Sequence, residues 1–240
     1  MSDIKLELPS KCLVYKNVDQ SQIVARTLKG KDELLLAEMS SDNFDKKFLA
    51  LLRNILKGID PEQLTLGDKL YLAIWLTINS YSKDYIYEYE CEHCWQKSEY
   101  VVDLSKLEIV ELPEGFKEPY TIKLPDNGLE INLRLLKFQD LIRLSDMEKS
   151  GANVFLRKYA MSIVDEKKSL IERESFLSEL SVKDTAMIRG FHEKFYHGPK
   201  MEVSYECPKC GGTGVMPVTF RLDMFLPYGK RLKQYLGDAI

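Results

Sequence analysis

Two Cys-x-x-Cys pairs are the feature that most constrains how this chain can fold. Their cysteines are Cys91, Cys94, Cys207 and Cys210. Both pairs follow the lead-in Tyr-Glu-Cys, and apolar residues alternate on the approach to each pair with the period of a strand. Strand-like runs also follow both pairs. Each pair is therefore predicted to form a zinc knuckle, in which a tight turn joins two strands, and two knuckles supply the four thiolates of a structural zinc site.

The distance between the two pairs along the chain weakens this motif without excluding a shared site. Residues 95–206 separate the pairs, whereas a compact zinc ribbon has roughly 15–20 residues at this place. Because the entropy of loop closure rises only with the logarithm of loop length, the distant hairpins can still pair in space. We therefore expect one structural zinc per chain, bound by all four cysteines. Such a site leaves no open position for a reactive water.

Other roles for the cysteines are a disulfide or a redox pair. The sequence shows no signal peptide and no transmembrane run, which predicts a reducing compartment where disulfides are rare. A thioredoxin-type pair normally precedes the start of a helix, whereas strand-like residues follow both pairs here. The remaining cysteine, Cys12, has no neighbouring ligand and is expected to be a small buried hydrophobic residue.

Composition and net charge limit the classes of partner that this protein is expected to bind. The chain has 240 residues, of which 45% are hydrophobic and 30% charged, as expected of a globular protein. Its net charge is −3 and glutamates surround the knuckles, which argues against nucleic acid as a partner because phosphate binding needs clustered Lys and Arg. The longest apolar run, "LYLAIWLTI", is too short to span a bilayer, which takes about 20 residues. We expect neither nucleic-acid binding nor a membrane span.

The pattern of apolar residues predicts helices in the N-terminal part. Apolar residues recur at helical spacing from Phe44 to Leu56, with Ser41 or Asp42 placed to cap the start and Gly58 the end. A second helix is predicted at Leu66–Ser80, where Thr65 and Asp68 have the spacing of a capping pair. Residues 1–84 are accordingly expected to form an arm and a helical region.

Strands and helices are both predicted between the two knuckles. A Pro-Asp-Asn-Gly turn at 125–128 joins two alternating runs into a hairpin, and helical patterns follow in 138–150 and 152–164. Ser181, with Asp184 three residues on, announces a last helix. The predicted fold class is α+β: a helical N-terminal part, then two zinc-knuckle hairpins that bracket an α+β middle segment. Residues 85–240 are expected to form one region closed by the split zinc site.

The predicted helix at Leu66–Ser80 is apolar nearly all round, which suggests a partner. One buried stripe can be formed by Leu66, Leu70, Ile74 and Ile78. The large apolar residues outside this stripe are Leu72, Trp75 and Leu76. We expect these three residues to contact another protein, because apolar area left in water favours association. The alternative is that the middle segment folds over this second stripe and makes it part of the core.

No catalytic motif stands out. The chain has no H-E-x-x-H, no G-x-S-x-G and no Walker loop, so we expect a protein that is not an enzyme. His192 and His197 lie on or beside the last predicted helix, where surface or capping roles are expected for them. The basic run "GKRLKQYLG" at 229–237 is expected to be either a solvated end or a docking tail.

Several longer runs carry a resemblance to a known family. They are "LTLGDKLYLAIWLTINSYSKDYIYEYECEHC", "VVDLSKL", "LEINLRLLKFQDLIRL" and the second Cys-x-x-Cys before "VTFRLDMF". In these runs the chain resembles the baseplate hub and hub-assembly proteins of T-even-like contractile-tailed bacteriophages. The resemblance implies a non-catalytic structural or assembly part of the tail baseplate hub. It further implies binding to other hub proteins, in the virion and in the host cytoplasm during assembly. A zinc-ribbon regulator that binds nucleic acid and a zinc-dependent assembly chaperone are the alternatives.

Overall fold

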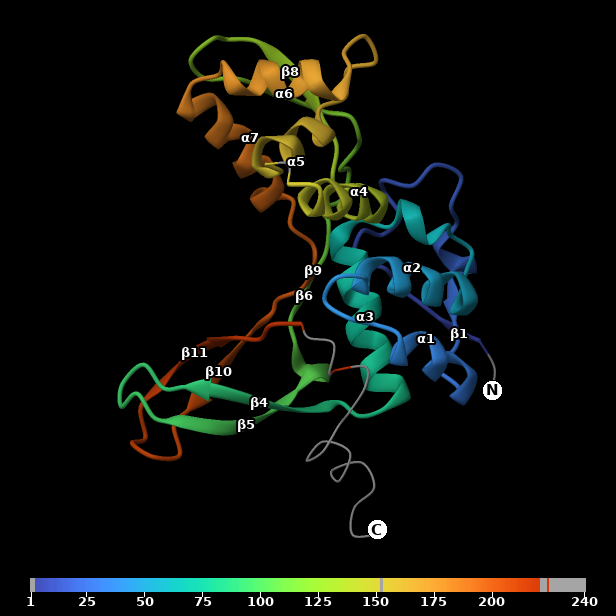
Figure 1. The fold of residues 1–240 in the computed structure, drawn as a ribbon, viewed down its shortest axis with the longest axis vertical. Coiled ribbons are helices and arrows are strands. Elements are labelled where there is room, and N and C mark those ends of the chain that lie inside the picture. The colour runs from blue at the N-terminus through green and yellow to red at the C-terminus, as the bar shows by residue number, and fades with distance from the viewer. Residues whose placement is uncertain (1–2, 152, 221–223, 225–240) are drawn as a thin grey trace.

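Helix α3, Leu66–Ser80, runs through the middle of the protein (Figure 1). Thr65 caps its start by accepting a hydrogen bond from the N–H of Asp68 at 3.2 Å, which confirms the predicted cap. The computed structural model describes residues 3–151, 153–220 and 224. Within these residues the fold is α+β, as predicted, while the basic run at 229–237 lies outside them.

The N-terminal elements build the first hydrophobic core against one side of α3. These elements are β1 (Ile4–Lys5), η1 (Gln20–Gln22), β2 (Val24–Ala25), η2 (Gly30–Asp32), α1 (Glu33–Ala37), α2 (Phe44–Ile55), β3 (Leu56–Lys57) and η3 (Pro61–Gln63). The short strands pair antiparallel in the order β1-β2-β3. Helix α2 turns Phe48, Leu51, Leu52 and Ile55 into this core, as its predicted amphipathic pattern requires. Its N-cap position is Asn43 rather than Ser41 or Asp42.

Two long hairpins form an arm that projects from the lower half of α3 (Figure 1). The first hairpin pairs β4 (Asp84–Glu90) with β5 (Lys97–Asp103) and leads into η4 (Leu104–Lys106). The second pairs β10 (Glu202–Glu206) with β11 (Thr213–Pro217). Their facing sides, together with Ile74 of α3, make a second core. Both predicted strand-turn-strand units are therefore present, and they lie side by side although far apart in sequence.

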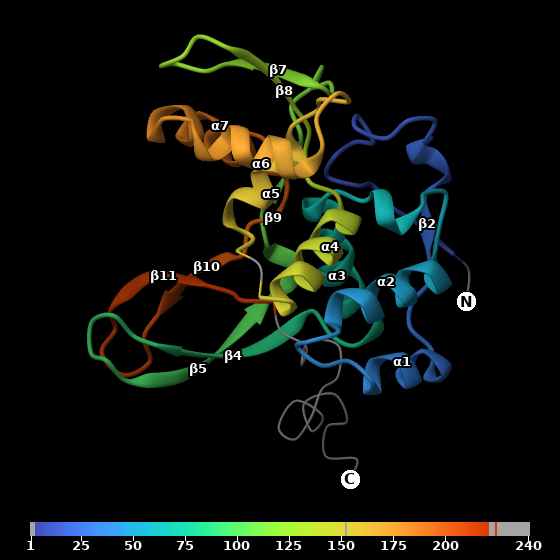
Figure 2. The same cartoon turned by 45° about the horizontal axis from the view of Figure 1, so that its top comes forward.

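The middle segment forms a third core at the opposite end of the molecule from the arm (Figures 1 and 2). Its elements are β7 (Tyr120–Lys123), β8 (Glu130–Leu133), α4 (Phe138–Lys149), α5 (Phe155–Ser162), α6 (Leu170–Ser178) and α7 (Val182–Lys194). The hairpin of β7 and β8 and the start of α7 at Ser181 confirm the predictions, whereas α6 was not predicted. Strands β6 (Ile109–Val110) and β9 (Gly198–Pro199) pair in the neck through which the chain passes between this segment and the arm.

The structure corrects the predicted partner interface on α3. Leu72 and Leu76 are only 1% and 0% exposed, because both pack in the first core with the N-terminal elements. Trp75 is half-buried against the same core. The first core covers one side of the helix and the second core covers another. This double burial explains why the helix carries apolar residues nearly all round. Leu72 and Leu76 are thus not available to another protein.

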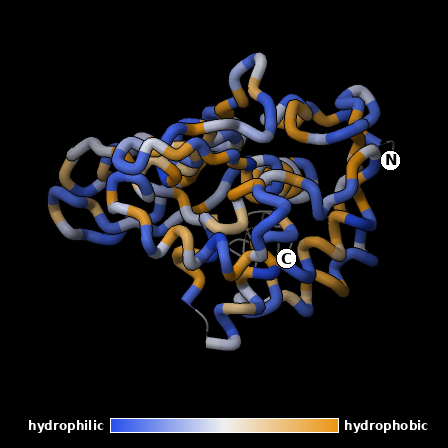
Figure 3. The backbone as a smooth tube through the Cα atoms, turned by 90° about the horizontal axis from the view of Figure 1, so that it is seen from above, coloured by the Kyte–Doolittle hydropathy of each residue, from blue (hydrophilic) through white to orange (hydrophobic). Residues whose placement is uncertain are grey.

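Hydrophobic and hydrophilic residues alternate along the chain, as Figure 3 shows. This mixture fits the three larger cores, which are each assembled from short apolar stripes, and a fourth, small cluster of Leu136, Leu144 and Met161. Among the residues that the structure describes, no helix combines the length and the apolar character needed to cross a membrane.

Candidate metal centre

The turn between β4 and β5 carries the first pair of cysteines. The N–H of Cys91 donates to the carbonyl of Gln96 at 3.1 Å, and the N–H of Trp95 donates to the carbonyl of Cys91 at 2.8 Å. These bonds wrap the turn so that Cys91 and Cys94 point to the same side. Trp95 has a φ of +59°, in the left-handed region, and its side chain is 71% exposed.

The turn between β10 and β11 repeats this geometry residue by residue. The N–H of Cys207 donates to the carbonyl of Gly212 at 2.8 Å, and the N–H of Gly211 donates to the carbonyl of Cys207 at 2.9 Å. Gly211 occupies the left-handed position, with a φ of +71°, that Trp95 takes in the first turn. Glycine accepts this conformation without a steric cost, which explains one of the glycines after Cys210.

Backbone amides in both turns point at a cysteine sulfur. The N–H of His93 donates to Cys91 Sγ at 3.4 Å, and the N–H of Lys209 donates to Cys207 Sγ at 3.4 Å. Such bonds favour the thiolate over the thiol. The bond from Lys209 is the main cause that lowers the pKa of Cys207 to about 6. The pKa of Cys91 is lowered as well, whereas the pKa of Cys94 is raised and that of Cys210 is raised to about 12. Because metals bind the thiolate, the first cysteine of each turn is the one whose pKa favours a cation.

The two turns bring all four predicted ligands together. Cys91 Sγ lies 3.8 Å from Cys210 Sγ, and Cys94 Sγ lies 3.8 Å from Cys207 Sγ. All four sulfurs lie within 4.8 Å of one another. A tetrahedron with zinc–sulfur bonds of about 2.3 Å has sulfurs about 3.8 Å apart, so the donor set and its spacing fit zinc. The cysteines are free thiols rather than disulfides, whose sulfurs would be about 2.05 Å apart.

Tyr205 joins the two knuckles beside the sulfur cluster. Its hydroxyl donates to Cys91 Sγ at 3.9 Å and accepts from the N–H of Glu92 at 3.4 Å. Its ring packs edge-on against Tyr89, at 5.3 Å between centroids, and Tyr100, at 5.5 Å. Tyr205 is therefore a residue of the second hairpin whose side chain packs against the first hairpin. The lead-in shared by the two pairs pointed to this residue, but its role between the hairpins was not predicted.

His93 makes a second link between the knuckles and was missed by the sequence reasoning. Its Nε2 donates to the carbonyl of Thr213 at 2.9 Å. The ring lies so close to Gly212 that a Cβ there would be 2.5 Å from Cδ2 of His93. His93 thus acts as a contact between turns rather than as a metal ligand. No spacing rule for ligands would have found it.

The other two histidines lie outside the cluster. His197 is 4% exposed, and its Nε2 lies 2.5 Å from Oγ1 of Thr65, the cap of α3. Of the two roles expected for His197, the surface role is wrong, because the residue is buried where α7 meets the start of α3. Its Nδ1 lies 3.1 Å from the carbonyl oxygen of Phe195, the C-cap residue of α7. Within the described part of the chain, the four cysteines are the one group of three or more His, Cys, Asp or Glu side chains placed to hold a metal.

The four cysteines can perform a structural role. The cluster lies in the turns at the outer end of the arm (Figure 1). Cys91 and Cys207 are buried there, Cys94 is half-buried and Cys210 is exposed. Four thiolates saturate a tetrahedral zinc and leave no position for a substrate. A metal here would fix one hairpin to the other.

Comparison with known proteins places the chain in a family. No curated protein and no solved structure matches it. A family model described as "T4 bacteriophage base plate protein" matches residues 1–226. The match includes all four cysteines, the central helix and the three cores. The chain therefore belongs to the T4 bacteriophage base plate protein family.

Proposed function

We propose that this protein is a structural or assembly component of the hub of a phage tail baseplate, and that it acts without catalysis. The observation that carries the proposal is the family match, which spans residues 1–226 and suggests a structural role in the baseplate. Its partners are then other baseplate hub proteins. The protein would be present in the tail baseplate of the virion and, during assembly, in the host cytoplasm.

Zinc is the second part of this proposal. The cluster of Cys91, Cys94, Cys207 and Cys210 would hold one zinc ion per chain, supported by the sulfur spacing and the amides that point at the sulfurs. Because residues 95–206 lie between the two pairs, the metal would staple the start of the middle segment to its end. Zinc binding to small peptides is worth about 10–16 kcal/mol at neutral pH, so this staple would contribute strongly to folding.

Co-expression with individual hub subunits of the same phage tests the partner. We expect the protein to co-purify with at least one hub subunit and not with tail-tube or sheath subunits, which serve as controls. Mass spectrometry of purified tail particles and of assembly intermediates then separates the two roles. Presence in finished particles supports a structural part, and presence in intermediates alone supports an assembly chaperone. Absence from both, without binding to any hub subunit, would contradict the proposed function.

Nucleic-acid binding can be tested separately with a gel shift over a range of salt concentrations. Binding driven by phosphate contacts weakens steeply with salt. We expect no gel shift at physiological salt, since the net charge is −3 and the knuckles are surrounded by glutamates. A tight complex that dissociates with rising salt would favour the zinc-ribbon regulator.

The division of the chain into a region of residues 1–84 and a region of residues 85–240 stays a prediction. Neither experiment depends on this division.

A further inference from the structure

Helix α7 and the hairpin after it repeat the plan of α3 and its hairpin. Thr65 caps α3, and the buried Asp68 follows three residues later. Ser181 and the buried Asp184 have the same roles in α7. Each aspartate accepts a backbone N–H from a residue 58 positions earlier, at 2.9 Å for Asp68 and at 2.8 Å for Asp184. The two Cys-x-x-Cys pairs also lie at the same distance from the two caps, so the helices can be compared position by position.

This comparison places His192 of α7 at the position of Leu76 in α3. Leu76 is 0% exposed and packs in the first core, so a leucine can fill this position. The Nε2 of His192 is buried and has no hydrogen-bond partner within the described part of the chain. A buried polar atom without a partner is unfavourable, and native proteins contain few of them. The polar ring at this position therefore indicates a role other than packing.

His192 lines a cavity of about 290 Å³ between the start of α3, helix α5 and the end of α7. Leu66 and Phe195 contribute to its apolar lining, and Lys158 supplies a positive charge. Lys158 is exposed, and its Nζ lies 5.7 Å from the centre of the Tyr159 ring. It forms no ion pair within the described part of the chain. A cation without a counter-charge thus lies beside an apolar hollow.

Other polar groups of this cavity already have partners. Nε2 of His197 lies 2.5 Å from Oγ1 of Thr65. The hydroxyl of Tyr196 donates to the carbonyl of Pro199. Within the described lining, Lys158 is therefore the group that a charged ligand would meet, and such a ligand carries a negative charge.

A carboxylate on an apolar stem matches this environment. It brings one negative charge for Lys158 and an apolar part for the lining of the cavity. A phosphate group carries about two negative charges at neutral pH and is recognised best by arginines, of which the described lining contains none. Burial and the positive charge of Lys158 lower the pKa of His192 to about 4, so the ring adds no second positive charge at neutral pH.

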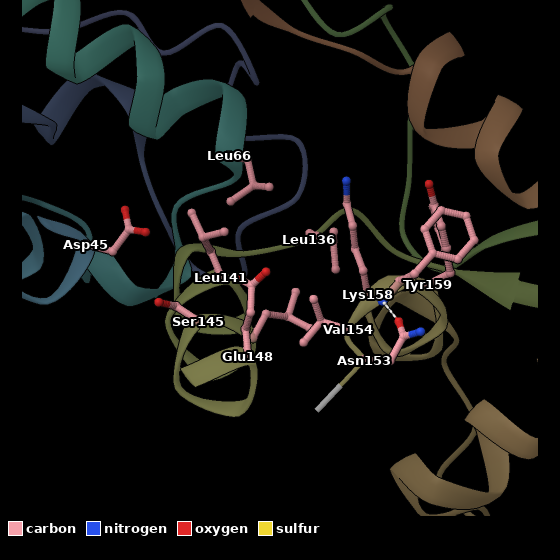
Figure 4. A pocket seen from close by; sticks show the side chains of 12 residues that line it. Asp45, Leu66, Leu136, Leu141, Ser145, Glu148, Asn153, Val154, Lys158 and Tyr159 are labelled. Carbon is pink, nitrogen blue, oxygen red and sulfur yellow. Dashed lines mark hydrogen bonds between the residues drawn. The ribbon is translucent and has the colours of Figure 1, made fainter. Parts of the chain in front are cut away.

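A groove of about 680 Å³ adjoins the cavity, between the start of α3 and helices α4 and α5 (Figure 4). The groove and the cavity share Leu66, Leu136 and Lys158 in their linings. Phe155 lines the groove and is 59% exposed. Glu148 lies toward the end away from Lys158, and it forms no ion pair among the described residues. A free carboxylate would fill the cavity alone, whereas a chain segment would cover the groove as well.

We propose that the cavity and the groove bind a segment of another protein in which apolar residues separate an acidic side chain from a basic one. The carboxylate enters the cavity and pairs with Nζ of Lys158 beside the ring of His192. The apolar residues cover Phe155 and the leucines of the groove, and the basic side chain pairs with Glu148. Burial of apolar area favours the complex, and the two charges fix the position of the segment. The proposed hub role would make this segment part of a hub subunit, but the site depends neither on that role nor on zinc.

Titration of the zinc-loaded full chain with 4-methylpentanoate, a carboxylate on an apolar stem, tests the cavity. NMR at pH 7 follows the ring signals of His192. We expect these signals to shift with the concentration of the probe until the site is saturated. The neutral 4-methylpentanamide is the control and should leave them unchanged. Signals that respond to neither compound, or equally to both, overturn the proposal.

Two synthetic peptides distinguish a partner segment from a free carboxylate. The first is acetyl-Glu-Leu-Ala-Leu-Leu-Ala-Lys-amide, and the second has Gln in place of Glu. We expect the first peptide to bind at least about tenfold more tightly than 4-methylpentanoate and than the second peptide. Equal affinity of the first peptide and the free carboxylate would assign the cavity to a small molecule and overturn the partner segment. Equal affinity of the two peptides overturns the role of the carboxylate.

Variants of the full chain test the contact with Lys158. Lys158→Gln should weaken binding of the first peptide at least about tenfold, whereas Lys158→Arg should retain most of it. Lys194→Gln is the matched control, because Lys194 is also exposed and lies over an aromatic ring, that of Phe195, but does not line the cavity. Thermal melting verifies that each variant is folded. Equal binding by Lys158→Gln and Lys194→Gln overturns the proposal. Co-purification with hub subunits is measured separately, so a failure of the hub role leaves these affinities unchanged.

Discussion

Arg134 donates two parallel hydrogen bonds to the carboxylate of Asp140, from Nη1 at 2.6 Å and from Nη2 at 3.0 Å. Arg26 holds Asp32 in the same way, at 2.6 Å and 3.0 Å. In each turn Nη1 also donates to the carbonyl of the next residue at 3.0 Å. The aspartate in turn accepts an N–H from the lysine three residues before it, at 2.8 Å.

Both turns have the sequence Arg-x-Leu-Lys-x-x-Asp, at 26–32 and at 134–140. Each follows a strand, β2 or β8, and leads into a helical element. The chain therefore uses one strand-to-helix turn twice, once in the N-terminal part and once in the middle segment. The two segments are short and about a hundred residues apart, so their similarity was not noticed in the sequence. The ion pair that they share makes the repeated turn recognisable in the structure.

We expect Arg134→Ala to lower the free energy of unfolding by about 2–4 kcal/mol, because it leaves the carboxylate of Asp140, which is 3% exposed, without its cation. Arg134→Lys keeps the charge but loses the paired bonds, so its loss should be intermediate. Urea unfolding measures both. Lys200→Ala, which removes an exposed pair with Glu108, is the control and should cost less than about 1 kcal/mol. A loss for Arg134→Ala as small as that of the control would contradict the role of the turn.

We expect Cys207→Ser to remove the stabilisation that zinc gives and Cys12→Ser to preserve it. A site that forms only in the folded chain adds its binding free energy to folding. Cys12 lies away from the cluster, and burial raises the pKa of its thiol to about 12, so it stays a neutral packing residue. Thermal melting with and without a chelator, together with metal analysis, measures the effect.

The chelator should lower the melting temperature of the wild type and of Cys12→Ser, and should leave Cys207→Ser unchanged. Metal analysis should give one zinc per chain for the first two proteins. The zinc proposal would be contradicted if the wild type were folded and free of metal, and if the chelator did not change its melting temperature. Equal shifts for the two serine variants would show that Cys207 has no special part in stability.

We expect stability to fall as the pH drops from about 6.5 to about 4. Burial lowers the pKa of His192 from 6.5 to about 4, and the positive charges of Lys158 and Arg134 add to this shift. The unfolded chain then binds more protons than the folded chain in this range, so folding loses stability as the pH falls. The size is on the order of 2–3 kcal/mol.

Urea unfolding of the wild type and of His192→Phe at pH 7 and pH 5 checks this expectation. The loss between the two pH values should be smaller in the variant, because its ring cannot take up a proton. His197→Phe is not a suitable control, since that ring contacts Thr65 at the start of α3. Cys12→Ser, which changes no group that titrates in this range, serves instead. The same loss in all three proteins would show that His192 is not responsible.

Local signals in the sequence predicted much of this fold. The caps at Thr65 and Ser181 were predicted because the capping side chain and the amide that it binds are three residues apart. Helix α6 was missed although Ser169 and Glu172 form a capping box at its start, a signal of the same local kind. The knuckles were predicted because ligand type and spacing are also local.

Tertiary contacts determine the features of the fold that could not be predicted from the sequence. The pattern of α3 shows two apolar faces but not what covers them, and the N-terminal elements bury Leu72 and Leu76. The second core, which takes in Ile74, is supplied by two hairpins that about a hundred residues separate in the sequence. His197 likewise becomes buried only when the end of α7 meets Thr65. Such contacts between distant segments leave no periodic trace in the chain.

The crossing of α3 and β9 gives the last prediction. A Cβ at Gly67 would lie 2.0 Å from the carbonyl oxygen of His197, and a Cβ at Gly198 would lie 2.8 Å from the carbonyl oxygen of Gly67. Gly198 also has a φ of +111°, which side chains rarely adopt. The start of α3 and the neck strand therefore approach backbone to backbone, with no space for a methyl group.

We expect Gly67→Ala to lower the free energy of unfolding by about 3 kcal/mol or more, because backbone atoms must move apart to admit the methyl group. Gly190→Ala is the matched control. Gly190 lies within α7, and a methyl group added there would meet nothing within 4 Å, so alanine should raise stability by about 0.5–1 kcal/mol. Thermal and urea unfolding of the two variants measure the opposite signs. If Gly67→Ala were as stable as the wild type, α3 and β9 could not be as close as the structure places them.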